Sequence, residues 1–420
     1  MVRERGAGGG QSIGDVAVMS DLTVQMPGKS QTRGGRRGGA GRRSAIGLAG
    51  RRLFSALAGA ALLAGLVSCA SAPVQKEVEL PVYPPPPAPA KFAYERTIMG
   101  SGDIIVETGS DKFRRFATGE ALRGKGFAKP YGIAVQRGRI YVSDTVSRHV
   151  HMIDLVEKKY LEIGIKGNGR LTKPLGLDID EQGRLFVCDG SANRVVVFNR
   201  DGEYITAVGG DDMLERPSGV TVSADGSRIY VVDTGGVKSQ DHRVRIFSLD
   251  GEHLGDIGTR GAGPGEFNLP LAADLDSDGV LRVLDTGNFR VEVFSPELKI
   301  VNSFGKPGRY AGQFSHAKGI ATDFDGRIYV SDTGFGVVQV FSSDGRILMS
   351  LGDRSEQPGP GVFLLPAGVA VDIDGRVYVV DQFYRKIDVF RPVFLPENWP
   401  YGQDYHATPG LRFVDEIETN

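Results

Sequence analysis

The sequence predicts an all-β protein, a six-bladed β-propeller of four-stranded antiparallel blades. First, an aspartate that follows a short apolar stretch recurs six times, at intervals of 44 to 52 residues. Second, each interval holds about four short stretches of β-branched and aromatic residues, which are typical of strands. Third, glycine makes up 59 of 420 residues, about twice its usual share, as many tight turns require. Six units of four strands match the radial architecture of a propeller. The recurring aspartates are Asp144, Asp189, Asp233, Asp285, Asp332 and Asp381.

The chain begins with a segment that is predicted to direct export. Residues 1–52 carry ten basic and three acidic side chains, and we interpret them as a disordered basic region or as an extension before the true start. Segment 53–69 contains the 16 uncharged residues Leu53–Ser68 and ends in Cys69. This run is short for a bilayer core of about 30 Å, but it fits the apolar region of a secretory signal.

The end of this segment, Leu66-Val67-Ser68-Cys69, resembles the lipobox of bacterial lipoproteins. The resemblance implies cleavage before Cys69 and lipidation of its sulfur, which makes the membrane a partner through the acylated N-terminus. The alternative is an uncleaved membrane anchor with an ordinary cysteine. Both interpretations place the body outside the cytoplasm, at the outer membrane, in the periplasm or on the cell surface. Arg51-Arg52 also resembles a twin-arginine signal, so the export route stays open.

A proline-rich stretch separates the signal from the repeats. Residues 70–91 are predicted to be a tether, because the run Pro84–Pro87 favours an extended polyproline II rod. The propeller is expected over 92–394, followed by a C-terminal tail over 395–420. Residues 110–123 have apolar side chains at helical spacing and form either a short helix or a plain loop.

The sixth unit needs an outer strand from elsewhere in the chain. After Phe390 the chain contains Pro392, Pro396 and Pro400, which are poor strand formers. The stretch Phe92–Met99 has the composition of a strand and lies ahead of the first unit. We therefore expect it to complete the last blade and to join the two ends of the ring.

The units resemble the NHL repeat family. The first unit reads Pro-Tyr-Gly-Ile-Ala-Val over 130–135 and Ile-Tyr-Val-Ser-Asp over 140–144, and the second continues with Asn-Arg-Val-Val-Val-Phe over 193–198. The resemblance covers roughly 92–390 and implies the six-bladed fold. Some units depart from the pattern: the fourth has Ala272 in place of glycine, and the fifth has Val337 where arginine is usual.

The charge of the body argues against a nucleic-acid partner. From Ala70 onward the chain has 40 basic and 48 acidic side chains, whereas binding to phosphate backbones needs an excess of basic groups. We expect a monomeric propeller that binds or scaffolds a protein, a peptide or an envelope glycan.

Loops from all units are expected to meet on one face of the propeller. The segments before each Pro-x-Gly and after each recurring aspartate emerge there, and mixed arginine and aromatic side chains are typical of binding hot spots. For the arginines at equivalent repeat positions, the alternative is that they brace neighbouring blades. The candidate binding residues are Tyr131, Arg148, Arg194, His242, Arg243, Phe289, Arg290, Lys318, Phe335, Tyr384 and Arg385.

No catalytic motif, cofactor site or metal site is predicted. The six aspartates are expected to accept backbone N–H groups in their own turns rather than to bind metal. The alternative function is a metal-dependent hydrolase or lyase in the central channel, with His242, His316 and a histidine of the first unit as conceivable ligands. Cys188 lies in an apolar strand and is expected to be a buried, inert thiol.

Overall fold

A computed structural model describes residues 80–104, 124–408 and 410–411. The export signal with Cys69, residues 70–79 of the expected tether and the segment 110–123, expected as a short helix or a loop, lie outside these residues. No helix in the described part of the chain is both long and apolar enough to cross a membrane.

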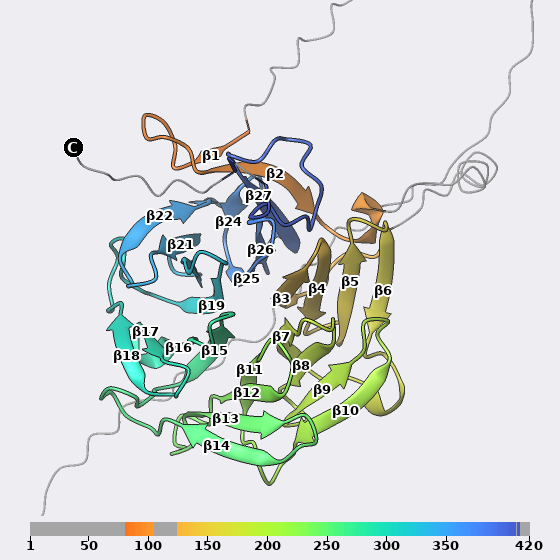
Figure 1. Cartoon of the computed structure of the whole chain (residues 1–420), viewed down its shortest axis with the longest axis vertical. Helices are drawn as coiled ribbons and strands as arrows, with labels where there is room; N and C mark the ends of the chain where they lie inside the picture. The colour runs from red at the N-terminus through yellow and green to blue at the C-terminus, as the bar shows by residue number, and fades with distance from the viewer. Residues whose placement is uncertain (1–79, 105–123, 409, 412–420) are drawn as a thin grey trace, which may run out of the picture. The chain divides into compact units, whose positions relative to one another are not determined.

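Six antiparallel sheets are arranged around a common centre as a six-bladed β-propeller (Figure 1), which confirms the predicted fold class. Blade 1 contains β3 (Pro130–Gln136), β4 (Arg139–Asp144), β5 (His149–Asp154) and β6 (Lys159–Ile163). Blade 2 contains β7 (Pro174–Ile179), β8 (Leu185–Asp189), β9 (Arg194–Phe198) and β10 (Tyr204–Gly209). Blade 3 contains β11 (Pro217–Val222), β12 (Arg228–Asp233), β13 (Arg243–Ser248) and β14 (His253–Ile257). Blade 4 contains β15 (Pro270–Leu275), β16 (Leu281–Asp285), β17 (Arg290–Phe294) and β18 (Ile300–Phe304).

Blades 5 and 6 complete the ring. Blade 5 contains β19 (Ala317–Thr322), β20 (Ile328–Asp332), β21 (Val337–Phe341) and β22 (Ile347–Leu351). Blade 6 contains β25 (Pro366–Val371), β26 (Val377–Asp381), β27 (Lys386–Pro392), β2 (Phe92–Ile98) and β1 (Val82–Tyr83). The smaller elements are the parallel pair β23 (Asp353–Arg354) and β24 (Val362–Phe363) and the 3-10 helices η1 (Ser101–Asp103), η2 (Gly167–Gly169) and η3 (Thr286–Asn288).

The innermost strands of the blades contact one another in turn, from β3 round to β25 and back to β3, so the ring is closed. Their backbones approach very closely at the Pro-x-Gly positions. A Cβ atom on Gly176 would lie 2.7 Å from the Cα atom of Gly219 in the next blade, and one on Gly132 would lie 2.5 Å from the carbonyl oxygen of Leu175. Glycine therefore recurs there because a side chain does not fit between neighbouring inner strands.

The ends of the chain close the ring, as expected. Strand β2 pairs antiparallel with β27, with Phe92 opposite Pro392 and Ile98 opposite Ile387. In Figure 1, β2 in orange lies beside β27 in blue. The N-terminal strand thus completes the last blade.

The expected proline-rich rod is wrong for the described part of that segment. Tyr83 pairs with Phe92, and the Lys91 N–H donates to the Tyr83 carbonyl, so the chain folds back on itself between them. Only 3% of Tyr83 is exposed, and its ring packs edge-on against Phe390 at 5.5 Å. Burial of this aromatic ring favours the folded-back conformation over an extended one.

A buried arginine joins blade 6 to both ends of the propeller. Arg376 is fully buried, and its guanidinium lies 2.6 Å from a carboxylate oxygen of Glu95 in β2 and 2.6 Å from one of Asp374. It also donates to the Trp399 carbonyl at 2.8 Å and lies 4.3 Å from the centre of the Tyr401 ring. The first turns of the C-terminal segment are therefore fixed against the blade that closes the ring.

Replacement of this arginine tests the closure. Arg376→Ala leaves the buried Asp374 carboxylate without its cation, and breaking a buried ion pair costs about 3–5 kcal/mol. We expect a loss of about 3 kcal/mol or more in the free energy of unfolding, measured in urea. The control is Arg346→Ala, at an exposed arginine in the turn between β21 and β22, which should change stability little. Equal stability of the two variants would contradict this role.

Candidate binding face and central channel

The six recurring aspartates organise one face of the propeller, here called the aspartate face. Each carboxylate is fully buried, and the six are Asp144, Asp189, Asp233, Asp285, Asp332 and Asp381. Each accepts N–H groups from the segment that precedes the inner strand of its own blade. Asp332, for example, accepts the Ser315 N–H at 2.7 Å, the His316 N–H at 3.0 Å and, in the following turn, the Gly334 N–H at 2.8 Å. The Asp332 carboxylate therefore holds two loops together. The expected hydrogen bonds from the aspartate's own turn are present for Asp144, Asp332 and Asp381, whereas the bonds from the preceding segment were not predicted.

The arginines at equivalent repeat positions bond to loops that join blades or to acidic residues of their own blade. Arg194 donates to the Arg170 carbonyl, and Arg290 donates to the carbonyls of Gly263 and Glu266. Arg290 also pairs with Asp285 and Glu292, and Arg243 pairs with Asp241 and Asp256. The structure thus engages these three candidate residues in contacts within the propeller.

Two further candidate residues differ in burial. His242 is fully buried; its Nε2 atom faces the Gly236 carbonyl at 3.0 Å, and its Nδ1 atom accepts the Leu269 N–H at 3.2 Å. This side chain is not available to a partner in this conformation. Phe289 is half-buried and packs against the hydrophobic cluster between blades 4 and 5.

The remaining candidates are accessible. Arg148 and Arg385 are exposed on the aspartate face, and Phe335 and Tyr384 are half-buried there. The Tyr384 hydroxyl donates to the Ser355 carbonyl at 2.7 Å. Arg385 and Tyr384 line a hollow of about 370 Å³ beside η1.

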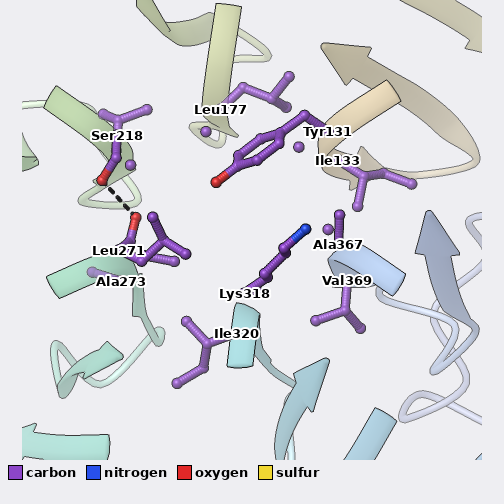
Figure 2. A pocket seen from close by; sticks show the side chains of 17 residues that line it. Tyr131, Ile133, Leu177, Ser218, Leu271, Ala273, Lys318, Ile320, Ala367 and Val369 are labelled. Atoms are coloured by element: carbon purple, nitrogen blue, oxygen red, sulfur yellow. Dashed lines mark hydrogen bonds between the residues drawn. The ribbon is translucent and has the colours of Figure 1, made fainter. Parts of the chain in front are cut away.

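The mouth of the central channel opens on the aspartate face as a cavity of about 60 Å³. Tyr131 and Lys318 line this cavity. Figure 2 shows both polar groups extending into the opening between the inner strands. The Lys318 amine donates to the Gln382 side chain at 3.1 Å, and burial together with the charge of Lys129 lowers its pKa. Burial raises the pKa of Tyr131 to about 12.

A second hollow of about 110 Å³ lies deeper in the channel and contains Asp178 and Asp274. Apolar side chains such as Ile133, Leu177 and Val369 border both hollows. Burial raises the pKa of Asp178 to about 6 and that of Asp274 to about 7. The sequence analysis did not predict an acidic channel, although an acidic residue in an inner strand, where three other units have alanine, is a signal of one.

A hollow of about 720 Å³ on the aspartate face is here called the blade 5–6 groove. Phe335 is the one predicted binding residue in it, and His316 was named only as a conceivable metal ligand. The two arginines of the groove, Arg309 and Arg354, were not among the predicted binding residues. The groove is lined by Arg309, Ser315, His316, Thr333, Gly334, Phe335, Arg354 and Leu365.

The histidines are not gathered into a metal site. Within the described residues, no three His, Cys, Asp or Glu side chains are grouped so that they could hold a metal ion. The rings of His149 and His151 are tilted against each other with their centres 4.4 Å apart, and the Nδ1 atom of His151 lies 2.7 Å from the Tyr160 hydroxyl. Cys188 is buried, and burial raises the pKa of its thiol, as expected for an unreactive cysteine.

The fold and these hollows define a six-bladed β-propeller with a loop-bearing face and a narrow channel. No known family model matches the chain. The protein lin-41 of Caenorhabditis elegans is 45% identical over 40 residues, which are 10% of this chain and 4% of that protein. The chain thus matches only a small part of that relative's length.

Solved structures share the fold at low sequence identity. A protein of unknown function from Bacteroides thetaiotaomicron is 17% identical, with a TM-score of 0.50, over 65% of this chain and 71% of that chain. A gluconolactonase from Xanthomonas campestris is 18% identical, with a TM-score of 0.48, over 63% and 86% of the two chains. Virginiamycin B lyase from Staphylococcus aureus is 16% identical, with a TM-score of 0.46, over 63% and 95%.

The acidic channel predicts a pH-dependent stability difference. The pKa of Asp274 is raised from 3.8 to about 7, so between these values the folded chain keeps a proton that the unfolded chain has released. The wild type therefore loses stability relative to Asp274→Asn as the pH rises through this window. We expect the difference in the free energy of unfolding between variant and wild type to be larger at pH 8 than at pH 5.

A matched control uses an aspartate with the opposite shift. The pKa of Asp225 is lowered to about 2, mainly by the Ser223 hydroxyl, so this carboxylate is ionised at both pH values. The stability difference between Asp225→Asn and the wild type should be the same at pH 5 and pH 8. A pH-independent difference for Asp274→Asn as well would show that Asp274 is ionised throughout.

Proposed function

We propose that this chain is an extracytoplasmic, lipid-anchored propeller of the NHL type that binds a partner on its aspartate face. The observation that carries the proposal is the lining of two hollows on this face, the channel mouth and the blade 5–6 groove. Basic and aromatic side chains line both, and no carboxylate does. Arginine and aromatic side chains in a recessed site are typical of binding hot spots.

The rigidity of the face supports binding. Buried aspartates hold the loops on both sides of the groove, so a partner meets a surface that is already ordered. Binding to an ordered surface avoids the entropy loss of fixing loops. A protein, a peptide or an envelope glycan fits this description.

The alternative, a metal-dependent hydrolase or lyase, would use the central channel. The gluconolactonase and the lyase among the solved structures are enzymes by name, but their likeness to this chain concerns the fold alone. No grouping of metal ligands in the described residues favours catalysis over binding.

The membrane anchor is tested at the cysteine. We expect Cys69→Ser to prevent lipidation and to release the chain from the membrane fraction, as followed by fractionation and by mass spectrometry of the N-terminus. Cys188→Ser serves as the control, because it removes the other cysteine and should leave the chain in the membrane fraction. A Cys69→Ser chain that stays membrane-bound with its signal attached would support the uncleaved anchor instead.

The aspartate face is tested by removing two aromatic side chains. We expect Phe335→Ala combined with Tyr384→Ala to reduce crosslinking of the full-length chain to its partner in native membranes at least tenfold, because both contribute contact area on this face. Quantitative mass spectrometry of the crosslinked products measures the effect. The control combines Phe324→Ala and Tyr204→Ala, two exposed aromatics away from this face. Undiminished crosslinking by the first variant, with its melting temperature preserved, would refute the assignment.

A further inference from the structure

The blade 5–6 groove forms where the fifth repeat departs from the others. In blades 2, 3 and 4 an arginine begins the third strand and contacts the connecting loop or acidic neighbours, whereas blade 5 has Val337 there. Arg354, from β23 after the outer strand, reaches the turn between β20 and β21. One of its terminal nitrogens, Nη1, donates to the carbonyls of Thr333 at 2.9 Å and Gly334 at 3.1 Å.

Two guanidinium groups in this groove have no acidic partner. Arg309 and Arg354 are exposed, and neither forms an ion pair with any residue in the described part of the chain. The buried carboxylate that precedes this turn, Asp332, accepts four backbone N–H groups, those of Ser315, His316, Gly334 and Phe335. Asp353 and Glu356 flank Arg354 in sequence but do not line the groove. The hydrogen bonds to Thr333 and Gly334 fix the Arg354 side chain through Nη1. The other N–H groups of its guanidinium remain available to a ligand.

The remaining lining determines what kind of ligand fits. Phe335 and Leu365 offer apolar surface next to the two arginines. The hydroxyls of Ser315 and Thr333 are present, but the side-chain amides and carboxylates that would accept hydrogen bonds from sugar hydroxyls are missing from the lining. A planar guanidinium matches a carboxylate through two parallel hydrogen bonds. A volume of about 720 Å³ is within the range of specific ligand sites.

We propose that the blade 5–6 groove binds an acidic peptide segment, with carboxylates at Arg309 and Arg354 and an apolar side chain against Phe335. This inference rests on the proposed function, since it names the ligand class of the same face. Exposed opposite charges also steer encounter, so the affinity decreases as salt increases.

Fluorescence anisotropy with the full-length acylated chain in detergent tests the proposal. The probe is a fluorescein-labelled decapeptide of alternating glutamate and leucine, and the comparison peptide has glutamine in place of glutamate. We expect Arg309→Gln combined with Arg354→Gln to weaken binding of the glutamate peptide at least tenfold and to reduce the salt dependence. The matched control, Arg228→Gln with Arg346→Gln, removes two exposed arginines at turns on the opposite face and should change the Kd less than twofold.

A charge exchange keeps the test decisive if the first variant is poorly folded. Arg309→Glu combined with Arg354→Glu should lose the glutamate peptide and gain a peptide of alternating lysine and leucine. No binding of the glutamate peptide by the wild type, or equal binding by the groove variant, would overturn the proposal. Binding of an oligogalacturonate in place of the peptide would also overturn it, and would assign the groove to a glycan. In each of these cases, crosslinking of the Phe335→Ala, Tyr384→Ala variant still tests separately whether the aspartate face binds a partner.

Discussion

The antiparallel ladder between β2 and β27 is the interaction on which the rest of the structure depends. The two strands lie about 300 residues apart in sequence, so this one ladder closes the ring that all six blades share. The inner strands contact one another round a closed circle, and the channel and the aspartate face exist only in that closed form. Two further contacts secure the same joint: Tyr83 packs against Phe390, and Arg376 holds both β2 and the C-terminal segment. Closure of a long loop has an entropic cost, and these two contacts offset part of it by stabilising the pairing of β2 with β27.

The buried aspartates fix the loops on one face of the closed ring. Each carboxylate accepts N–H groups of its own blade, and hydrogen bonds to an ionised acceptor are stronger than those between neutral groups. The bracing arginines then fasten the loops that connect one blade to the next. The loops are thereby positioned by repeated residues, and the side chains between them are free to vary without loss of the scaffold.

The fold could be predicted because its causes recur in the sequence. The glycine of Pro-x-Gly marks the close approach of inner strands, the aspartate marks the loops that it holds, and an unpaired last blade required a strand from the N-terminus. The site could be predicted only in part. The burial of His242, the packing of Phe289 on its hydrophobic cluster and that of Tyr83 on Phe390 depend on neighbours that are distant in sequence, so local pattern did not reveal them. Arg309 and Arg354 lie in the connections from one blade to the next, and neither was among the predicted binding residues.

The repeat and its exceptions therefore have different roles. Where the repeat is intact, the arginine that begins the third strand forms contacts inside the propeller. Arg290, for example, pairs with Asp285 and Glu292. Where it is broken, at Val337, an arginine from another loop occupies the neighbouring carbonyls and keeps part of its guanidinium unpaired. The same reasoning applies to the channel, where Lys318 and Tyr131 replace the apolar or small side chains of other units. The polar groups that can contact a ligand thus lie at the positions where the sequence departs from its own repeat, while the repeated positions supply the framework that holds them.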